Sequence, residues 1–81
     1  MTEIEYGISR DIIKDLLIYI DHVNASERNK EIVKQYVEGV SYATLGRLYG
    51  ISGSRVRSII VNYRRHAVNY GKEIGELRVI Y

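Results

Sequence analysis

The amino-acid sequence predicts an all-α small domain of four helices, or of five if its C-terminal tail adds another helical turn. Three observations favour this class. The chain contains no proline, and an interior proline would cost a helix about 3 kcal/mol. Apolar residues recur at helical spacing in several segments. A serine precedes each of these segments and a glycine follows three of them, which are typical signals for the start and end of a helix.

Length and composition limit what the protein can be. Its 81 residues predict a single domain, 1–81. With no cysteine, disulfides and thiolate metal sites are excluded. The longest apolar run, residues 16–20, is far shorter than the roughly 20 residues of a membrane span. The N-terminus has no signal-peptide pattern. We therefore expect a soluble, cytoplasmic protein with no membrane partner.

The first two predicted helices cover residues 9–23 and 26–39. Ser9 and Ser26 are placed to cap them, and Gly39 to end the second. Each has one apolar face for the core. These faces consist of Ile12, Ile13, Leu16, Ile20 and Val23 in the first helix, and of Ile32, Val33, Tyr36 and Val37 in the second.

A short third helix is predicted from Ser41 to Gly50, and a long fourth over 53–70 between its cap Ser52 and Gly71. At 100° per residue, the fourth helix has one apolar side and one basic, small-polar side without a carboxylate. Its apolar side consists of Val56, Ile59, Ile60, Tyr63, Ala67 and Tyr70, its outward side of Ser54, Arg57, Ser58, Val61 and Arg65, and its flanks of Arg55, Asn62 and Arg64.

The spacing between these two helices predicts a helix-turn-helix over residues 41–71. Two helices that cross steeply after a short turn need a small residue where they touch, and Gly46 fits. The turn needs a residue that tolerates positive φ, and Gly50 fits. Ile51 would anchor the turn in the core. The second helix of such a motif enters the major groove of DNA.

The tail, residues 72–81, is ambiguous. Leu77 to Tyr81 could form a short strand or a helical turn. Exposed apolar residues at a chain end need a cover. Either the tail packs back on the first helix, or it forms a homodimer or partner contact.

Charge divides the chain into two halves. Residues 1–40 contain five basic and eight acidic side chains, a net charge of −3, and residues 41–81 contain seven and two, a net charge of +5. Five arginines and no acid fall within residues 41–70. This asymmetry indicates a polyanionic partner for the second half only.

Residues 41–67 resemble the second half of region 4 of bacterial sigma factors, the part that recognises the promoter −35 element. The matching runs are Ser41-Tyr-Ala-Thr-Leu-Gly46, Tyr49-Gly50-Ile51-Ser52 and Arg55-Val56-Arg57-Ser58-Ile59, and residues 25–39 are similar to the preceding helix. The resemblance implies that Gly53, Ser54, Arg55, Arg57 and Ser58 face base edges and nearby phosphates. It also implies that Ser41 and Tyr42 touch the DNA backbone.

The residue types agree with this implication. Arginine can bond both guanine acceptors in the major groove, as we expect of Arg55 and Arg57. Ser52 and the free amides at its helix start can hold a phosphate. Most of the tyrosines lie on apolar faces and are expected in the core, with Tyr42 the exposed exception. The full predicted DNA-binding set is Ser41, Tyr42, Arg47, Ser52, Gly53, Ser54, Arg55, Arg57, Ser58, Asn62, Arg64 and Arg65, of which Arg47, Arg64 and Arg65 are assigned to phosphates or to solvated charge.

The sequence contains no catalytic or cofactor motif. His22 and His66 lie on different predicted helices and do not form a metal-ligand pair. No glycine loop of the nucleotide-binding kind is present. The sequence therefore predicts neither an enzyme nor a metal or cofactor site.

The leading hypothesis is a sequence-selective binder of double-stranded DNA in transcription regulation, acting as a homodimer or tethered to RNA polymerase. A second hypothesis is an interaction module that docks on RNA polymerase, as region 4 also does, through the outward Ile18 and the apolar tail. A third is a DNA-binding accessory of recombination or packaging.

Overall fold

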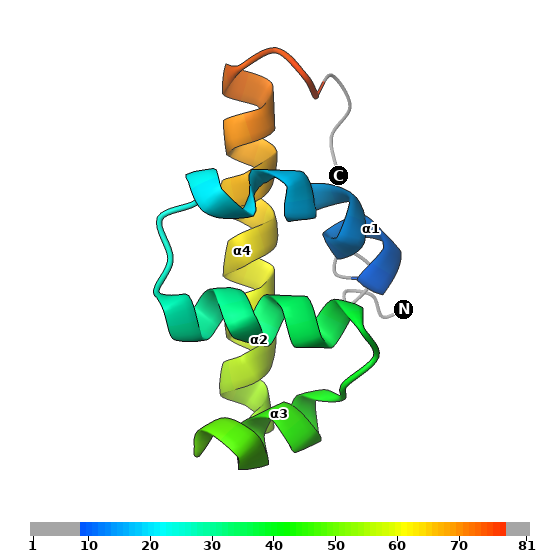
Figure 1. The fold of residues 1–81 in the computed structure, drawn as a ribbon, viewed down its shortest axis with the longest axis vertical. Helices are drawn as coiled ribbons and strands as arrows, with labels where there is room; N and C mark the ends of the chain where they lie inside the picture. Colours follow the sequence, from blue (N-terminus) through cyan, green and yellow to red (C-terminus); the bar gives the residue numbers. More distant parts are fainter. Residues whose placement is uncertain (1–8, 78–81) are drawn as a thin grey trace.

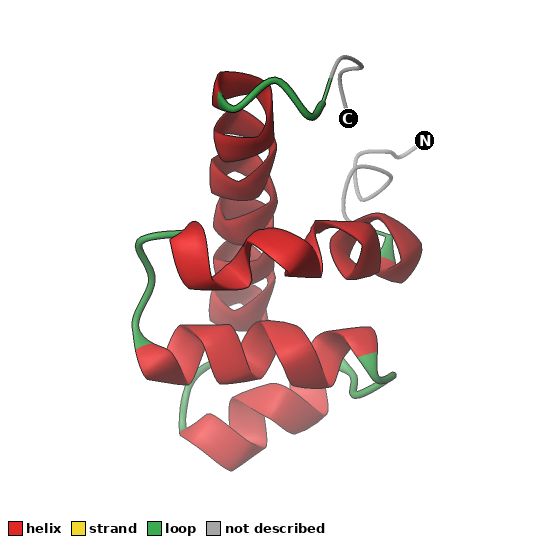
Figure 2. Cartoon of the chain, turned by 45° about the horizontal axis from the view of Figure 1, so that its top comes forward, coloured by secondary structure: helices red, strands yellow, loops and turns green. Residues whose placement is uncertain are grey.

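The computed structural model describes residues 9–77 as an all-helical domain, which confirms the predicted fold class. The described residues contain no strand (Figure 2). In chain order the elements are α1 (Arg10–Asp15), the 3-10 helix η2 (Leu16–His22), α2 (Glu27–Val37), α3 (Tyr42–Tyr49) and α4 (Gly53–Glu73). Figure 1 shows α4 running the length of the molecule, with η2, α2 and α3 crossing it at successive levels.

The core lies between α4 and the helices that cross it. Its largest fully buried side chains come from every helical segment: Ile13, Leu16, Ile32, Val33, Leu45, Val56 and Ile60. One buried hydrogen bond joins two of the layers, from the Tyr63 hydroxyl in α4 to the Leu16 carbonyl oxygen, at 2.7 Å. The apolar side predicted for residues 53–70 is therefore confirmed as the core side.

The first predicted helix, 9–23, begins as expected but does not stay α-helical. Ser9 caps α1, its Oγ accepting from the Ile12 amide. From Leu16 the chain tightens into the 3-10 helix η2, in which residues i and i+3 lie on one face. Leu16 and Tyr19 are thereby both buried. His22, three residues on, stacks on the Tyr70 ring of α4 with centroids 4.9 Å apart.

The fourth helix does not end at Gly71, as the sequence analysis predicts, but continues to Glu73. Gly75, with φ at +81°, lies in the turn that follows. Gly71 serves a different purpose, because a Cβ atom there would lie 2.5 Å from Leu77 Cδ1 and 3.1 Å from Tyr19 Cε2. It makes room for the chain to fold back.

The described part of the tail packs on the first helical segment, as one of the two alternatives predicts. Leu77 packs against the core, and the Tyr19 hydroxyl donates to Glu76 Oε1 at 2.9 Å. Residues 74–77 form neither a strand nor a further helix. The remaining predicted strand or helical turn, residues 78–81, lies outside the described residues.

The junction of α3 and α4 has the backbone geometry that its glycines predict. Gly50 ends α3 with φ at +71°, the left-handed region. Gly46 lies where the turn meets α3, and a Cβ atom on it would be 2.5 Å from the Ile51 carbonyl oxygen. The Ile51 amide donates to the Gly46 carbonyl at 2.9 Å, and the Ile51 side chain packs partly buried against the core.

Candidate nucleic-acid interface

The starts of α3 and α4 lie against each other. A Cβ atom on Gly53 would be 3.8 Å from the backbone of Ala43. Both helices are capped as predicted, Ser41 Oγ accepting from the Thr44 amide and Ser52 Oγ from the Arg55 amide. The first amides of a helix have no intrahelical acceptor and carry partial positive charge. The contact therefore brings two positive helix ends together at one end of the domain.

The first four turns of α4 present a polar, cationic face to solvent. We call this the α4 face, and its exposed members are Ser54, Arg55, Ser58, Asn62 and Arg65. All five belong to the predicted DNA-binding set, so the structure brings this part of that set together. The Arg65 guanidinium donates to Asn62 Oδ1 at 3.0 Å, which holds two of these side chains side by side.

The arginines of residues 41–70 form no ion pair with a carboxylate among residues 9–77. Among residues 9–77 the one ion pair is Lys30 with Glu27, at 3.8 Å, on α2. Arg47, exposed on α3, donates instead to Thr44 Oγ1 at 3.2 Å. Arg55 donates to no acceptor in the described part of the chain. The positive charge of these arginines therefore remains available to an anionic partner.

Tyr42 is not the exposed tyrosine that the sequence analysis predicts. Its ring is half-buried and stacks on Tyr36, with centroids 5.1 Å apart and planes 9° from parallel. Its hydroxyl donates to Tyr36 Oη at 3.3 Å. Burial and this hydrogen bond raise the pKa of Tyr42, against the opposing charges of Arg57 and Arg10. The predicted exposure was wrong because the Tyr42 ring extends back over α2. The position of Tyr42 at the start of α3 does not reveal this contact.

Two arginines predicted to contact DNA lie away from the α4 face. Arg57 is half-buried rather than fully outward, on the side of α4 where its charge acts on Tyr42. Arg64 is also half-buried, and its Nε is buried with no hydrogen-bond partner in the described part of the chain. Both occupy one flank of α4, whereas Arg55 occupies the other.

The four tyrosines expected in the core, Tyr36, Tyr49, Tyr63 and Tyr70, differ in how deeply they are buried. Tyr36 and Tyr63 are buried, whereas Tyr49 and Tyr70 are half-buried at the core edge. His22 and His66 are both exposed. Within residues 9–77, no three His, Cys, Asp or Glu side chains are grouped as metal ligands.

The structure also shows a cleft that the sequence analysis missed. It has a volume of about 240 Å³ and lies between α4 and the loop that joins η2 to α2. Asn24, Asn29 and His66 line it together with Arg55, Ser58 and Asn62 of the α4 face. His66 is four residues after Asn62, so helical spacing could have placed it on this flank. The two asparagines come from another part of the chain and carry no local signal.

Comparison with protein families, curated proteins and solved structures finds no match to this chain. No helix in the described part of the chain is long and apolar enough to cross a membrane.

Proposed function

We propose that the protein binds double-stranded DNA, with α3, the turn after it and α4 acting as a helix-turn-helix. The observation that carries this proposal is the α4 face, an exposed cationic helix surface without a carboxylate. It begins where the positive ends of two helices meet.

In the proposed complex, the first turns of α4 lie in the major groove. That groove, about 12 Å wide, admits an α-helix. The small residues Gly53, Ser54 and Ser58 let the backbone approach the base edges closely. Arg55 can bond guanine, a bidentate pairing that major-groove geometry favours. Arg65 and Arg47 supply phosphate contacts that fix the orientation.

The role that follows is sequence-selective binding in transcription regulation, which also agrees with the resemblance of residues 41–67 to sigma region 4. One helix-turn-helix of this size buries little surface on DNA. A second copy of the chain, or a contact with RNA polymerase, would supply the remaining affinity.

Fluorescence anisotropy with a labelled 30-base-pair duplex tests the proposal. The wild type should bind at low salt. Arg55→Ala should weaken binding about tenfold, because it removes a charge-assisted contact of roughly 1–3 kcal/mol. The matched control is Lys72→Ala, which removes one charge from an exposed position in the last turn of α4 and should change affinity less than threefold. Equal effects of the two variants would contradict the assignment of the α4 face.

A second candidate function is docking on another protein, RNA polymerase included. Two exposed apolar side chains favour it, Ile18 on η2 at 70% exposure and Leu48 on α3 at 64%. If this is the function, Ile18→Asp should abolish capture of purified RNA polymerase while leaving duplex binding intact. Unchanged capture would remove this candidate.

A further inference from the structure

The cleft beside α4 has a polar rim that offers hydrogen-bond donors and no acid. Three walls meet there: the η2–α2 loop with Asn24, the first turn of α2 with Asn29, and the flank of α4 with Arg55, Asn62 and His66. Its floor is apolar and includes Val33, Ile59 and Tyr63. No lining residue is an aspartate or glutamate. A low-dielectric floor under cationic and amide donors strengthens their attraction for an anion.

Two asparagines of the rim are oriented by arginines that lie outside the cleft. Arg28 Nε donates to Asn29 Oδ1 at 3.1 Å, and the Arg65 guanidinium donates to Asn62 Oδ1 at 3.0 Å. Each amide oxygen is thereby occupied, and each NH₂ group keeps two donors without an acceptor among residues 9–77. Both side chains can therefore donate to a group in the cleft.

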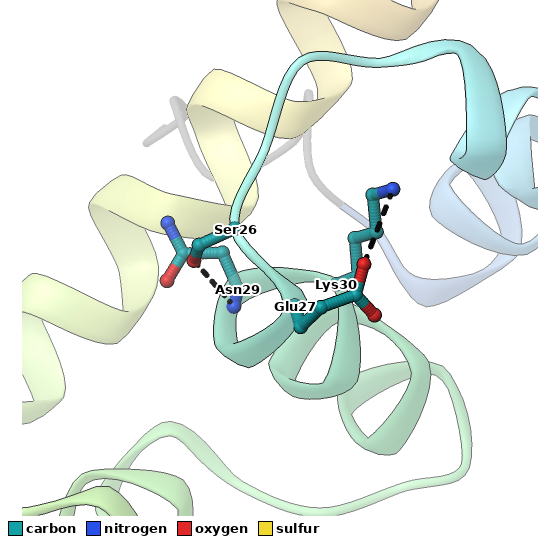
Figure 3. A network of polar contacts seen from close by, with 4 residues as sticks. All are labelled: Ser26, Glu27, Asn29 and Lys30. Atoms are coloured by element: carbon teal, nitrogen blue, oxygen red, sulfur yellow. Dashed lines mark hydrogen bonds and ion pairs between the residues drawn. The ribbon is translucent and has the colours of Figure 1, made fainter.

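The two acids of α2, Glu27 and Glu31, are each two residues from Asn29 and so lie about 160° around the helix from it at 100° per residue. Glu27, in the same helical turn as Asn29, pairs with Lys30 at 3.8 Å. Figure 3 shows that pair on one side of the turn and the Asn29 amide on the opposite side, where α4 passes. The backbone amide of Asn29 is held separately, donating to Ser26 Oγ at 3.1 Å. The negative charge of α2 is thus turned away from the cleft.

We propose that this cleft seats one phosphate group. Donors on opposite walls suit a tetrahedral anion with several acceptor oxygens better than a planar carboxylate with two. The volume of about 240 Å³ is below the roughly 300–1,000 Å³ of pockets that enclose drug-sized ligands, as expected for one phosphate with part of its sugar. A DNA backbone phosphate or a free nucleotide could supply this chemistry. Of these two sources, the DNA backbone depends on the proposed function. Three residues of the cleft, Arg55, Ser58 and Asn62, also belong to the α4 face that is proposed to contact DNA.

The test uses Asn29→Asp, which keeps the shape of the side chain and the oxygen bonded by Arg28 but adds a negative charge to the rim. An acid in the first turn favours a helix, so the variant should fold. The control is Asn69→Asp, the same change at an exposed position of α4 outside the cleft. In the first arm, inorganic phosphate and then adenosine monophosphate are titrated into the protein. The side-chain amide resonances of Asn24, Asn29 and Asn62 are followed by nuclear magnetic resonance.

We expect these resonances to shift in the wild type, and Asn29→Asp to raise the Kd for phosphate at least tenfold, with less than a twofold change for Asn69→Asp. In the second arm, Asn29→Asp should weaken duplex binding at least fivefold and reduce its salt slope by about 0.9. Phosphate binding with unchanged duplex affinity would assign the site to a free nucleotide instead. If phosphate binds but the wild type binds no duplex, the result supports the phosphate site and contradicts only the proposed DNA binding. Absence of phosphate-induced shifts, with equal effects of the two variants on duplex binding, would overturn the proposal.

Discussion

Gly46 is the residue on which the geometry of the α3–α4 junction depends most directly. In Gly46→Ala, the new Cβ atom would lie 2.5 Å from the Ile51 carbonyl oxygen and 3.2 Å from the Gly53 amide nitrogen. Both are backbone atoms, so no side-chain rotation relieves the clash. The turn must move by at least about 0.5 Å to reach the 3.0 Å below which Cβ contacts are essentially never found.

The expected cost follows from two opposing terms. Overpacking a rigid site costs about 1–3 kcal/mol, and a clash with backbone belongs at the upper end. Alanine is about 1 kcal/mol better than glycine inside a helix. The net loss of unfolding free energy is therefore about 2 kcal/mol, or a fall in Tm of about 8–16 °C for a domain of this size.

Thermal unfolding followed by circular dichroism measures this change. The matched control is Gly53→Ala in the same helix pair, where the new Cβ atom would meet the α3 backbone at 3.8 Å, an ordinary contact. That variant should keep the wild-type Tm or raise it by a few degrees, because alanine has the higher helix propensity. A Gly46→Ala protein as stable as the wild type would refute the proposed close contact.

Three further predictions concern interactions that hold the domain together. Tyr63→Phe leaves the Leu16 carbonyl without its hydroxyl donor and should cost about 1–3 kcal/mol in urea unfolding; no loss would contradict that bond. Burial also raises the pKa of Tyr63 to about 12. The wild type should therefore lose stability as pH rises from about 10, where an unfolded tyrosine ionises, towards 12, and Tyr63→Phe should lose less over this window. Arg10→Lys should cost about 1–2 kcal/mol by the same assay, because Arg10 donates to the Tyr36 carbonyl in α2 and to the Val40 carbonyl in the loop after it, and lies 4.3 Å from the Tyr36 ring centroid; a smaller change than that of Lys14→Ala would argue against this role. Ser52→Ala should lower Tm by about 4–8 °C through loss of the α4 cap, at about 1 kcal/mol, and an unchanged Tm would show that the cap contributes nothing.

The predictions that succeeded depend on short-range chemistry. Ser9, Ser26, Ser41 and Ser52 all cap helices through their Oγ atoms, because a cap needs only the residue and the amide three positions later. The Gly50 turn likewise follows from one residue's tolerance of positive φ. Helical spacing was enough to identify the core side of α4.

The predictions that failed depend on contacts between distant segments. Gly71 resembles a helix terminator in the sequence, but its missing side chain instead admits Leu77 and Tyr19. Residues 16–22 pack against α4 as a 3-10 helix, whereas their local spacing predicts an α-helix. Tyr42 is covered by its stack on Tyr36.

The candidate site was also predictable where its residues lie on one helix, and not where it joins distant segments. One helix supplies the α4 face, so angular spacing placed Ser54, Ser58 and Arg65 on its outward side, where all three are exposed. The cleft joins two segments separated by more than 25 residues. Asn24 and Asn29 become relevant only when the fold brings them beside α4.

The central claim, that the α4 face binds the DNA backbone and groove, is tested most directly by the salt dependence of duplex binding. Arg47 and Arg65, which are assigned to phosphates, and the phosphate proposed for the cleft give about three phosphate contacts, and hence a slope of log K against log salt near −2.7 for the wild type. Arg65→Ala should reduce its magnitude by about 0.9, whereas Lys72→Ala should leave it unchanged. A wild type that binds no duplex at 50 mM salt, or a slope that Arg65→Ala does not alter, would contradict the account.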